Sequence, residues 1–349
     1  KFDMKKIPLL NIILTMLMFS QELTNSTQIN ISKIWSQEPL GWTYPIAINV
    51  PNIDIPENGF PVCVLLHGFG GNGENMQLQW VNFLQNHILI SPTGYMNCWN
   101  ISDEPSEAPD VEMINDLIEQ LQTFDNVNPN RIRLIGSSNG SALANRIFIE
   151  NNNLGIDIIC AVISQLSEAQ YHNNNFHYPS GTTGGNHEFA GYDNITSPLL
   201  GRKYLNIGNI NDQTIPYEGG PAVGVNFLNS QEAIYIIARS QGYEGNQISE
   251  EGNQIGSSSV YEYSYLSNHV VHLKGDAGHG INSIQKEYII NYFSNLEGDI
   301  NEDSYTNIQD IVLMVNLILN NEFNINADLN SDTSIDVIDI VILVNIILN

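Results

Sequence analysis

The chain has 349 residues, which is enough for one large domain with an appendage or for two ordinary domains. Its charge is unusual, because 38 acidic residues face 12 basic ones and the formal net charge is −26. A field of this sign repels phosphate backbones and anionic lipid surfaces, so nucleic-acid binding is not expected. Three cysteines in a chain of this length do not make a disulfide framework.

The N-terminus has the order of a secretory signal. A basic start at Met4, Lys5 and Lys6 is followed by an almost wholly apolar stretch over residues 9–19, and Ser20 offers a small residue for cleavage. Such a stretch is too short to span a bilayer. We therefore predict a signal peptide over residues 1–20, with the residues before Met4 an artefact. The protein is expected to be secreted to the extracellular space, with the periplasm or the cell surface as alternatives.

After the signal, strand-like and helix-like segments alternate. The expected strands are residues 45–50, 62–66, 87–91, 131–135, 156–164, 204–207 and 270–273, and the clearest expected helices are residues 111–124 and 141–150. Strands that alternate with helices indicate a mostly parallel sheet covered by helices on both faces. We expect this α/β domain to occupy residues 21–297.

Residues 167–197 interrupt this alternation. They are rich in Asn, His, Gly and Tyr and show no clear period. A long segment of this kind is usually functional or mobile, and we interpret it as an insertion on the substrate side of the domain.

A candidate nucleophile lies in the run Gly136-Ser137-Ser138-Asn139-Gly140, which directly follows one expected strand and opens a helix. A serine at such a turn is held in a strained conformation, with its hydroxyl at a helix N-terminus where backbone N–H groups favour negative charge. The Gly-x-Ser-x-Gly pattern alone is common by chance, and the alternative is an ordinary glycine turn. The strand before the run and the helix after it favour Ser138 as a nucleophile.

A serine hydroxyl needs a base that takes its proton and a carboxylate that orients the base. His279 stands between two glycines after the last expected strand, at the strand end where sheet enzymes place catalytic groups. Asp212 lies in the loop after the preceding expected strand, which gives the order Ser, Asp, His typical of these hydrolases. Asp276 is the alternative acid, since it is close in sequence to His279.

A second glycine-rich run, His67-Gly68-Phe69-Gly70-Gly71, follows the expected strand at residues 62–66. It resembles the loop that supplies part of an oxyanion hole. The tetrahedral intermediate of acyl transfer carries negative charge on the former carbonyl oxygen, which preorganised N–H donors stabilise. We predict the backbone N–H groups of Phe69 and Asn139 as these donors.

Several segments together resemble the polyhydroxybutyrate depolymerase and feruloyl esterase group of α/β-hydrolases. They are residues 65–73, 110–124, 128–132, 136–140 and 212–217 and the pair Gly278-His279. The resemblance implies an α/β-hydrolase fold and ester hydrolysis without a cofactor, with Ser138, Asp212 and His279 as the catalytic triad. The chain departs from the family pattern at Ser141, at Gly208-Asn209 and in lacking a tryptophan after His279.

The C-terminal region contains an internal repeat. Two loops carry oxygen-bearing side chains at positions one, three, five, nine and twelve, and an apolar run follows each loop: Asp299, Asn301, Asp303, Asn307 and Asp310, then Asp328, Asn330, Asp332, Asp336 and Asp339. Calcium prefers such hard oxygen ligands at this spacing. The alternative is a pair of solvated acidic turns before two apolar helices.

The module at residues 298–349 resembles a type I dockerin. The resemblance implies two bound calcium ions and a cohesin-like protein partner. Loop position six, normally glycine for a sharp turn, is Ser304 in one copy and Thr333 in the other. The following helices are apolar nearly all round, so they are expected to be buried against each other, against the hydrolase or against a partner.

The sequence thus predicts a secreted carboxylic ester hydrolase that works through an acyl-serine intermediate. Its substrate is expected to be a polyester such as polyhydroxybutyrate or its oligomers. The alternative is a feruloyl or acetyl xylan esterase that removes side-chain esters from polysaccharide. A hypothesis of a different class is a non-catalytic adhesion or scaffold-bound protein on the same fold, against which the intact Ser138, Asp212 and His279 argue.

Overall fold

A computed structural model describes residues 21–56, 58–181, 188–266, 268–294, 298–301, 306–324, 327–329 and 334–348. The signal segment predicted over residues 1–20 lies outside the described residues and stays a prediction. Among the helices of the described part, none combines the length and the hydrophobicity that a membrane crossing requires.

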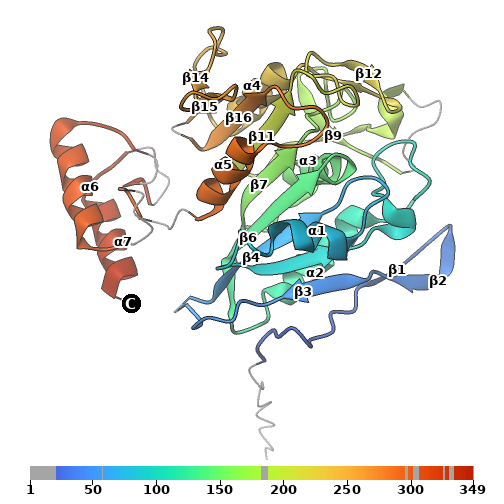
Figure 1. Cartoon of the computed structure of the whole chain (residues 1–349), viewed down its shortest axis with the longest axis horizontal. Coiled ribbons are helices and arrows are strands. Elements are labelled where there is room, and N and C mark those ends of the chain that lie inside the picture. Colours follow the sequence, from blue (N-terminus) through green and yellow to red (C-terminus); the bar gives the residue numbers. More distant parts are fainter. Residues whose placement is uncertain are drawn as a thin grey trace, which may run out of the picture.

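A large mixed sheet forms the centre of the molecule, with the strand order β14-β15-β16-β11-β7-β6-β4-β5-β3 (Figure 1). Its strands are β3 (Ile46–Asn49), β4 (Phe60–Leu66), β5 (Ile88–Pro92), β6 (Val127–Ser137), β7 (Ile156–Val162), β11 (Lys203–Asn209), β14 (Asn253–Gln254), β15 (Tyr261–Tyr265) and β16 (Val270–Gly275). The six central strands, β16, β11, β7, β6, β4 and β5, run parallel to one another. At the two edges, β3, β15 and β14 pair antiparallel with their neighbours.

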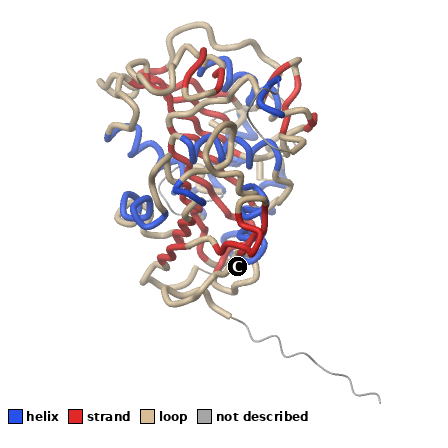
Figure 2. Tube along the Cα trace, turned by 90° about the vertical axis from the view of Figure 1, so that its right-hand side faces the viewer, coloured by secondary structure: helices blue, strands red, loops and turns tan. Residues whose placement is uncertain are grey.

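Helices cover both faces of this sheet, and the strands are visible between them (Figure 2). The helices of this domain are α1 (Gly73–Trp80), α2 (Asp110–Leu121), α3 (Asn139–Glu150), α4 (Ser230–Ser240) and α5 (Ser283–Ser294), with short 3-10 turns at η1 (Tyr95–Asn97) and η2 (Glu188–Gly191).

Strand β4 shows how the two faces are filled. Val62 and Val64 belong to a core cluster that also holds apolar side chains of α2, α3 and α4. Cys63 and Leu65, which point the other way, belong to a second cluster with side chains of α1 and α5. Alternate residues of one strand therefore enter two separate cores, as strands buried on both faces do. The predicted mostly parallel sheet with helices on both faces is confirmed.

Parallel strands end at one edge of a sheet, and the predicted functional residues gather there. The loops after β4, β6, β11 and β16 contain Phe69, Ser138, Asp212 and His279 respectively. Because these strands are hydrogen-bonded neighbours or near neighbours, loops far apart in the sequence meet above the same edge.

Residues 167–197 show no clear period in the sequence, but their described part has regular structure. This part forms a small antiparallel sheet of β8 (Tyr171–His172), β9 (Asn175–Tyr178) and β10 (Asn194–Thr196). Asn173 and Asn174 join β8 to β9 and both have positive φ, of 49° and 60°. This is the backbone that a two-residue hairpin turn needs and that asparagine tolerates, so the Asn-Asn pair was the available signal.

Other small elements lie outside the main sheet. A hairpin of β1 (Ser32–Trp35) and β2 (Glu38–Thr43) and a second of β12 (Gly220–Ala222) and β13 (Val225–Phe227) were not predicted. All three cysteines are buried and unpaired, so none forms a disulfide.

The C-terminal region contains the two expected helices, α6 (Ile308–Asn320) and α7 (Val337–Leu348). They contact one another around a small core of Ile300, Met314, Ala327 and Leu343. Much of their remaining apolar surface, including Val312 and Val341, is exposed. The two helices therefore bury one stripe of apolar side chains against each other. Burial of the rest against a partner, and the likeness to a dockerin, stay predictions.

Candidate active site

Ser138 occupies a strained turn between β6 and α3. Its φ and ψ are 54° and −116°, a region that residues with a side chain rarely adopt. The Ser138 N–H donates to the carbonyl of Val162 at 2.9 Å, which fixes the turn against β7. A serine on a strand-to-helix turn above a mostly parallel sheet is the nucleophile elbow of the α/β-hydrolase fold.

The two glycines of the elbow are required by close backbone approach. A Cβ at Gly140 would collide with the carbonyl oxygens of Leu66 and His67, and a Cβ at Gly136 would collide with the backbone of Gly140. The start of α3 thus lies directly against the end of β4, and only glycine permits this contact.

The structure brings Ser138, His279 and Asp212 into one hydrogen-bonded chain. His279 Nε2 lies 2.9 Å from Ser138 Oγ, and His279 Nδ1 lies 2.8 Å from Asp212 Oδ2. Asp212 Oδ1 also accepts the backbone N–H groups of Thr214 at 2.8 Å and Ile215 at 3.0 Å. The carboxylate is 2 % exposed and the imidazole 27 %, so the acid is enclosed while the base remains accessible.

These contacts assign a role to each nitrogen of His279. Because a carboxylate only accepts, Nδ1 carries the hydrogen and donates to Asp212. Nε2 is then the free lone pair that faces the Ser138 hydroxyl. The arrangement can remove a proton from Ser138, which is the chemistry of an activated nucleophile.

The alternative acid, Asp276, does not meet His279. Its backbone carbonyl accepts a hydrogen bond from the Asn211 side chain at 2.6 Å. Within the described residues, the carboxylate that pairs with His279 is Asp212. Closeness in sequence did not decide the partner, because the two loops are brought together by neighbouring strands β11 and β16.

Asn209 is a functional residue that sequence reasoning noted only as a departure from the family pattern. Its side-chain nitrogen donates to the carbonyls of Gly278 at 3.1 Å and Gly280 at 2.6 Å, on either side of His279. Its side-chain oxygen accepts from Gln285 Nε2 at 2.8 Å, and both side chains are buried. Asn209 therefore holds the loop that carries the base.

The loop after β4 lies beside the nucleophile, as predicted. A Cβ placed on Gly68 would lie 3.5 Å from Ser138 Cβ. Within the described residues, the N–H groups of Phe69 and Asn139 donate to no loop or turn carbonyl. Both remain available to an incoming oxygen, although their role as oxyanion donors stays a prediction.

His67 has a structural role at the start of this loop. Its Nε2 accepts the Gly94 N–H at 3.0 Å, so the hydrogen is on Nδ1, which lies 2.7 Å from the Gly68 carbonyl. Burial lowers the pKa of His67 and keeps the ring neutral. With both nitrogens engaged, His67 is unsuited to act as the base.

The remaining described histidines do not contact Ser138. His172 and His177 stack on one another in the insertion, with ring centroids 3.6 Å apart. His87 and His272 are buried and His269 is half-buried, and burial lowers the pKa of each. His187 lies outside the described residues.

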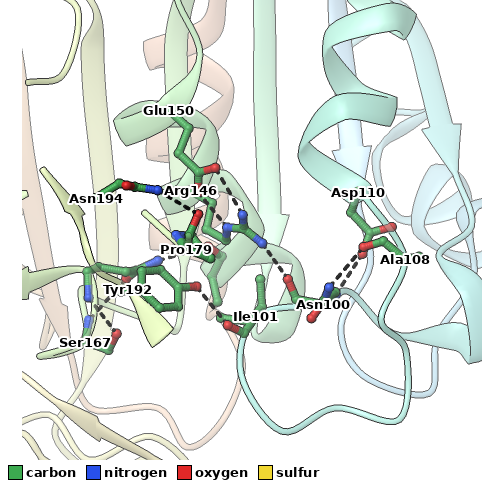
Figure 3. A network of polar contacts seen from close by, with 12 residues as sticks. Asn100, Ile101, Ala108, Asp110, Arg146, Glu150, Ser167, Pro179, Tyr192 and Asn194 are labelled. Atoms are coloured by element: carbon green, nitrogen blue, oxygen red, sulfur yellow. Dashed lines mark hydrogen bonds and ion pairs between the residues drawn. The ribbon is translucent and has the colours of Figure 1, made fainter. Parts of the chain in front are cut away.

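A polar network connects the insertion to the nucleophile helix (Figure 3). Arg146 of α3 pairs with Glu150 at 2.6 Å and donates to the carbonyl of Asn100 at 2.8 Å. Tyr192, from the insertion, donates its hydroxyl to the carbonyl of Ile101 at 2.8 Å. The segment around Asn100 is thus fastened to both the insertion and α3.

The described parts of the two C-terminal loops repeat one pattern of contacts. Asp310 Oδ1 accepts the N–H of Ile300 at 2.8 Å, and the equivalent Asp339 Oδ1 accepts the N–H of Leu329 at 2.8 Å. The second oxygen of each carboxylate accepts the N–H of the position-nine residue, Asn307 or Asp336. Each position-twelve carboxylate thus ties its loop to the start of its helix.

The calcium prediction is not decided by these contacts. Asp303, Asn330 and Asp332 lie outside the described residues, as do Ser304 and Thr333. Among the described residues, no three acidic, histidine or cysteine side chains form a group that could hold a metal ion. Carboxylates at positions one and twelve are nevertheless buried in both loops: Asp299, Asp310, Asp328 and Asp339. Such oxygens fit a calcium ion chemically.

No protein-family model matches the chain, and no curated protein does. Among solved structures, it is similar to a carboxylesterase from Bacillus cereus (12% identity, TM-score 0.47, covering 72% of this chain and 93% of the other). It is also similar to an acetyl xylan esterase from Aspergillus awamori (13% identity, TM-score 0.46, covering 71% and 93%). A third is LpqC, a poly(3-hydroxybutyrate) depolymerase from Bordetella parapertussis (16% identity, TM-score 0.36, covering 52% and 64%). Similarities of this size do not define an activity.

Proposed function

We propose that this protein is a carboxylic ester hydrolase that uses Ser138 as its nucleophile. The observation that carries the proposal is the continuous chain from Ser138 Oγ through His279 to Asp212, at a strained strand-to-helix turn. Nothing in an ordinary glycine turn requires a serine at positive φ within hydrogen-bond reach of a histidine oriented by a buried carboxylate.

The reaction proceeds in two halves. Ser138 Oγ attacks the ester carbonyl carbon while His279 Nε2 takes the hydroxyl proton. The carbonyl oxygen becomes an oxyanion, which the N–H groups of Phe69 and Asn139 stabilise. When the intermediate collapses, the bond to the alcohol oxygen breaks and His279 gives its proton to the departing alcohol. Water then attacks the acyl-serine through the same histidine, which releases the acid and restores Ser138.

Asp212 supports both halves without losing its negative charge. It accepts the Nδ1 hydrogen of His279, so Nε2 is free to take the serine proton. It also stabilises the imidazolium that forms in each half. The two backbone N–H groups on its other oxygen hold the carboxylate in place for this task.

The substrate we propose is a polyester such as polyhydroxybutyrate or its oligomers, on the strength of the motif resemblance. Side-chain esters of polysaccharide, feruloyl or acetyl, are the alternative, which a dockerin-like module would favour. Release of 3-hydroxybutyrate from the polymer, of ferulate from methyl ferulate and of acetate from acetylated xylan should be measured under identical conditions. A higher kcat/KM for methyl ferulate or xylan than for hydroxybutyrate oligomers would replace the first proposal by the second.

Ser138→Ala tests the enzyme itself, with Ser137→Ala as the matched control. With p-nitrophenyl acetate and butyrate, Ser138→Ala should lower kcat/KM by about 10⁴-fold or more, whereas Ser137→Ala should stay within about twofold of wild type. Equal rates for wild type and Ser138→Ala would contradict the proposal. They would favour the non-catalytic adhesion or scaffold-bound protein.

We further propose that the C-terminal module binds two calcium ions and a cohesin-like protein, and that the chain is secreted. The duplicated loops with buried carboxylates at matching positions support the calcium sites. The exposed apolar side chains of α6 and α7 are the surface that a partner would cover. The secretion proposal rests on the pattern of residues 1–20 alone.

A further inference from the structure

Trp99 is buried just after η1, and it contacts both segments that carry the predicted oxyanion donors. A buried indole N–H needs an acceptor, and Trp99 Nε1 donates to the carbonyl of His67 at 2.7 Å. The backbone N–H of Trp99 donates to Asn139 Oδ1 at 2.7 Å. One residue therefore connects the loop before Phe69 to the residue after the nucleophile.

The side chain of Asn139 is held at both ends of its amide. Besides accepting from Trp99, it donates through Nδ2 to the Trp99 carbonyl at 3.1 Å and to Glu104 Oε1 at 2.8 Å. Glu104 Oε2 is in turn fixed by the backbone N–H groups of Ile101 at 3.0 Å and Ser102 at 2.6 Å. An amide that both donates and accepts here has a defined plane, which restrains the backbone of Asn139 at the start of α3.

The loop on the other side is restrained in the same way. The His67 ring packs on the Trp99 ring, with centroids 4.7 Å apart, while its Nε2 accepts from Gly94. His67 is thus held by its carbonyl, its ring face and its ring nitrogen. Phe69 follows two residues later, so Trp99 sets the position of one donor segment relative to the other.

We propose that Trp99 is a positioning residue for acyl transfer, which holds the N–H groups of Phe69 and Asn139 at the separation that the oxyanion requires. This inference rests on the proposed function. Donors fixed before the reaction stabilise the developing charge without reorganisation, and a small displacement is costly. Loss of the bridge therefore acts on the transition state more than on the bound ester.

Trp99→Phe tests the bridge, because it keeps an aromatic ring but removes the indole N–H. With p-nitrophenyl butyrate, kcat should fall about 10- to 100-fold while KM changes less than about threefold. Affinity for a phenylboronic acid, whose tetrahedral serine adduct places an oxygen at the donors, should fall by a similar factor. Trp42→Phe, in the hairpin of β1 and β2, is the matched control and should leave kcat and boronate affinity unchanged.

Asn139→Ala also tests whether the contacts of Trp99 position the two donors, and it can be used if Trp99→Phe does not fold. It keeps the backbone N–H of residue 139 but removes both bonds to Trp99, so kcat should again fall with little change in KM. Where both variants fold, the double variant should lose less activity than the product of the single losses, since both act on one geometry.

The outcomes separate the two proposals. If wild type hydrolyses no ester, the proposed function fails. If wild type is active and Ser138→Ala is not, but Trp99→Phe and Asn139→Ala keep the wild-type kcat and boronate affinity, only the positioning role is overturned. A fall in kcat with unchanged boronate affinity would also overturn it, because the donors would then be undisturbed.

Discussion

At Ser138 the reactivity depends on backbone positions as much as on the side chain. A φ of 54° points the hydroxyl toward His279, and this conformation persists because Gly136 and Gly140 let two backbones approach closely. The base is likewise placed through main-chain groups, since Asn209 contacts the carbonyls on both sides of His279. Residues outside the catalytic triad, among them Gly136, Gly140 and Asn209, thus hold Ser138 and His279 in place.

Asn209→Asp gives a prediction at this scale. A carboxylate cannot donate to the carbonyls of Gly278 and Gly280 but can still accept from Gln285, so the His279 loop loses its restraint. We expect kcat to fall about tenfold or more with KM nearly unchanged, measured by steady-state kinetics with p-nitrophenyl butyrate. Asn130→Ala, an exposed asparagine at the opposite end of β6, serves as control. Unaltered kcat in a folded Asn209→Asp protein would show that the loop holds itself.

At the scale of elements, short connections carry specific backbone requirements. The turn between β8 and β9 takes two asparagines at positive φ, which gives the insertion a sheet of its own. In the C-terminal region, α6 begins with a capping box formed by Asn307 and Asp310. Asn307 Oδ1 accepts the N–H of Gln309, and Asp310 Oδ2 accepts the N–H of Asn307. The same carboxylate also holds the preceding loop, so loop and helix form one unit.

The calcium proposal belongs to this scale. Titration of the full chain with calcium in a calorimeter should show binding heat for wild type. Replacing Asp299 and Asp328 together by alanine removes a first-position ligand from each loop and should abolish the heat, while ester hydrolysis stays unchanged. Glu322→Ala, an exposed acid of the same module, should bind like wild type. Equal heats for the double variant and wild type, or no heat for wild type, would remove the calcium proposal.

At the scale of the whole molecule, buried histidines link folding to pH. His272 bonds Asn206 and Tyr217, and burial lowers its pKa to about 3. Burial also lowers the pKa of His269 to about 4 and that of His87 well below its ordinary value. Asp110 acts in the opposite sense, because burial raises its pKa to about 7. Burial lowers the pKa of His67 and His177 in the same direction, so these five histidines together oppose Asp110, whose carboxyl group favours its protonated form.

The expected sign follows from these shifts. Each depressed histidine contributes stability above its unfolded pKa near 6.5, and this stability is lost as the pH falls toward the folded pKa, at about 1.4 kcal/mol per pH unit. Asp110 offsets about one of these histidines, since its folded form gains a proton over pH 4 to 7. We therefore expect the free energy of unfolding, measured by urea denaturation, to decrease as the pH is lowered from 6.5 to 5.

His272→Gln supplies the control for the pH prediction. Glutamine can bond to Asn206 and Tyr217 but does not titrate, so the decrease per pH unit should be about 1.4 kcal/mol smaller than in wild type. The comparison uses the change in the free energy of unfolding per pH unit, so a loss of stability in His272→Gln that is the same at every pH does not affect it. A slope equal to that of wild type would mean that His272 does not control the pH dependence.

Local sequence patterns were enough to predict the fold class and the positions of the catalytic residues. Alternating apolar segments specified the sheet with helices on both faces, and Gly136 and Gly140 marked the elbow because no other residue fits there. The order of Ser138, Asp212 and His279 pointed to three loops at one sheet edge, where the structure joins them. These features were readable because they depend on periodicity and on the conformational limits of single residues.

Tertiary structure alone decided the rest. Asp212 rather than Asp276 meets His279, Asn209 holds the His279 loop, and Trp99 connects His67 to Asn139. Each of these contacts joins residues that are far apart along the chain or that compete with a nearer candidate. No local pattern encodes such a contact, because hydrogen bonds between loops depend on which strands are neighbours and how closely their ends pack. Sequence alone therefore located the reactive groups, and packing decided how they are held.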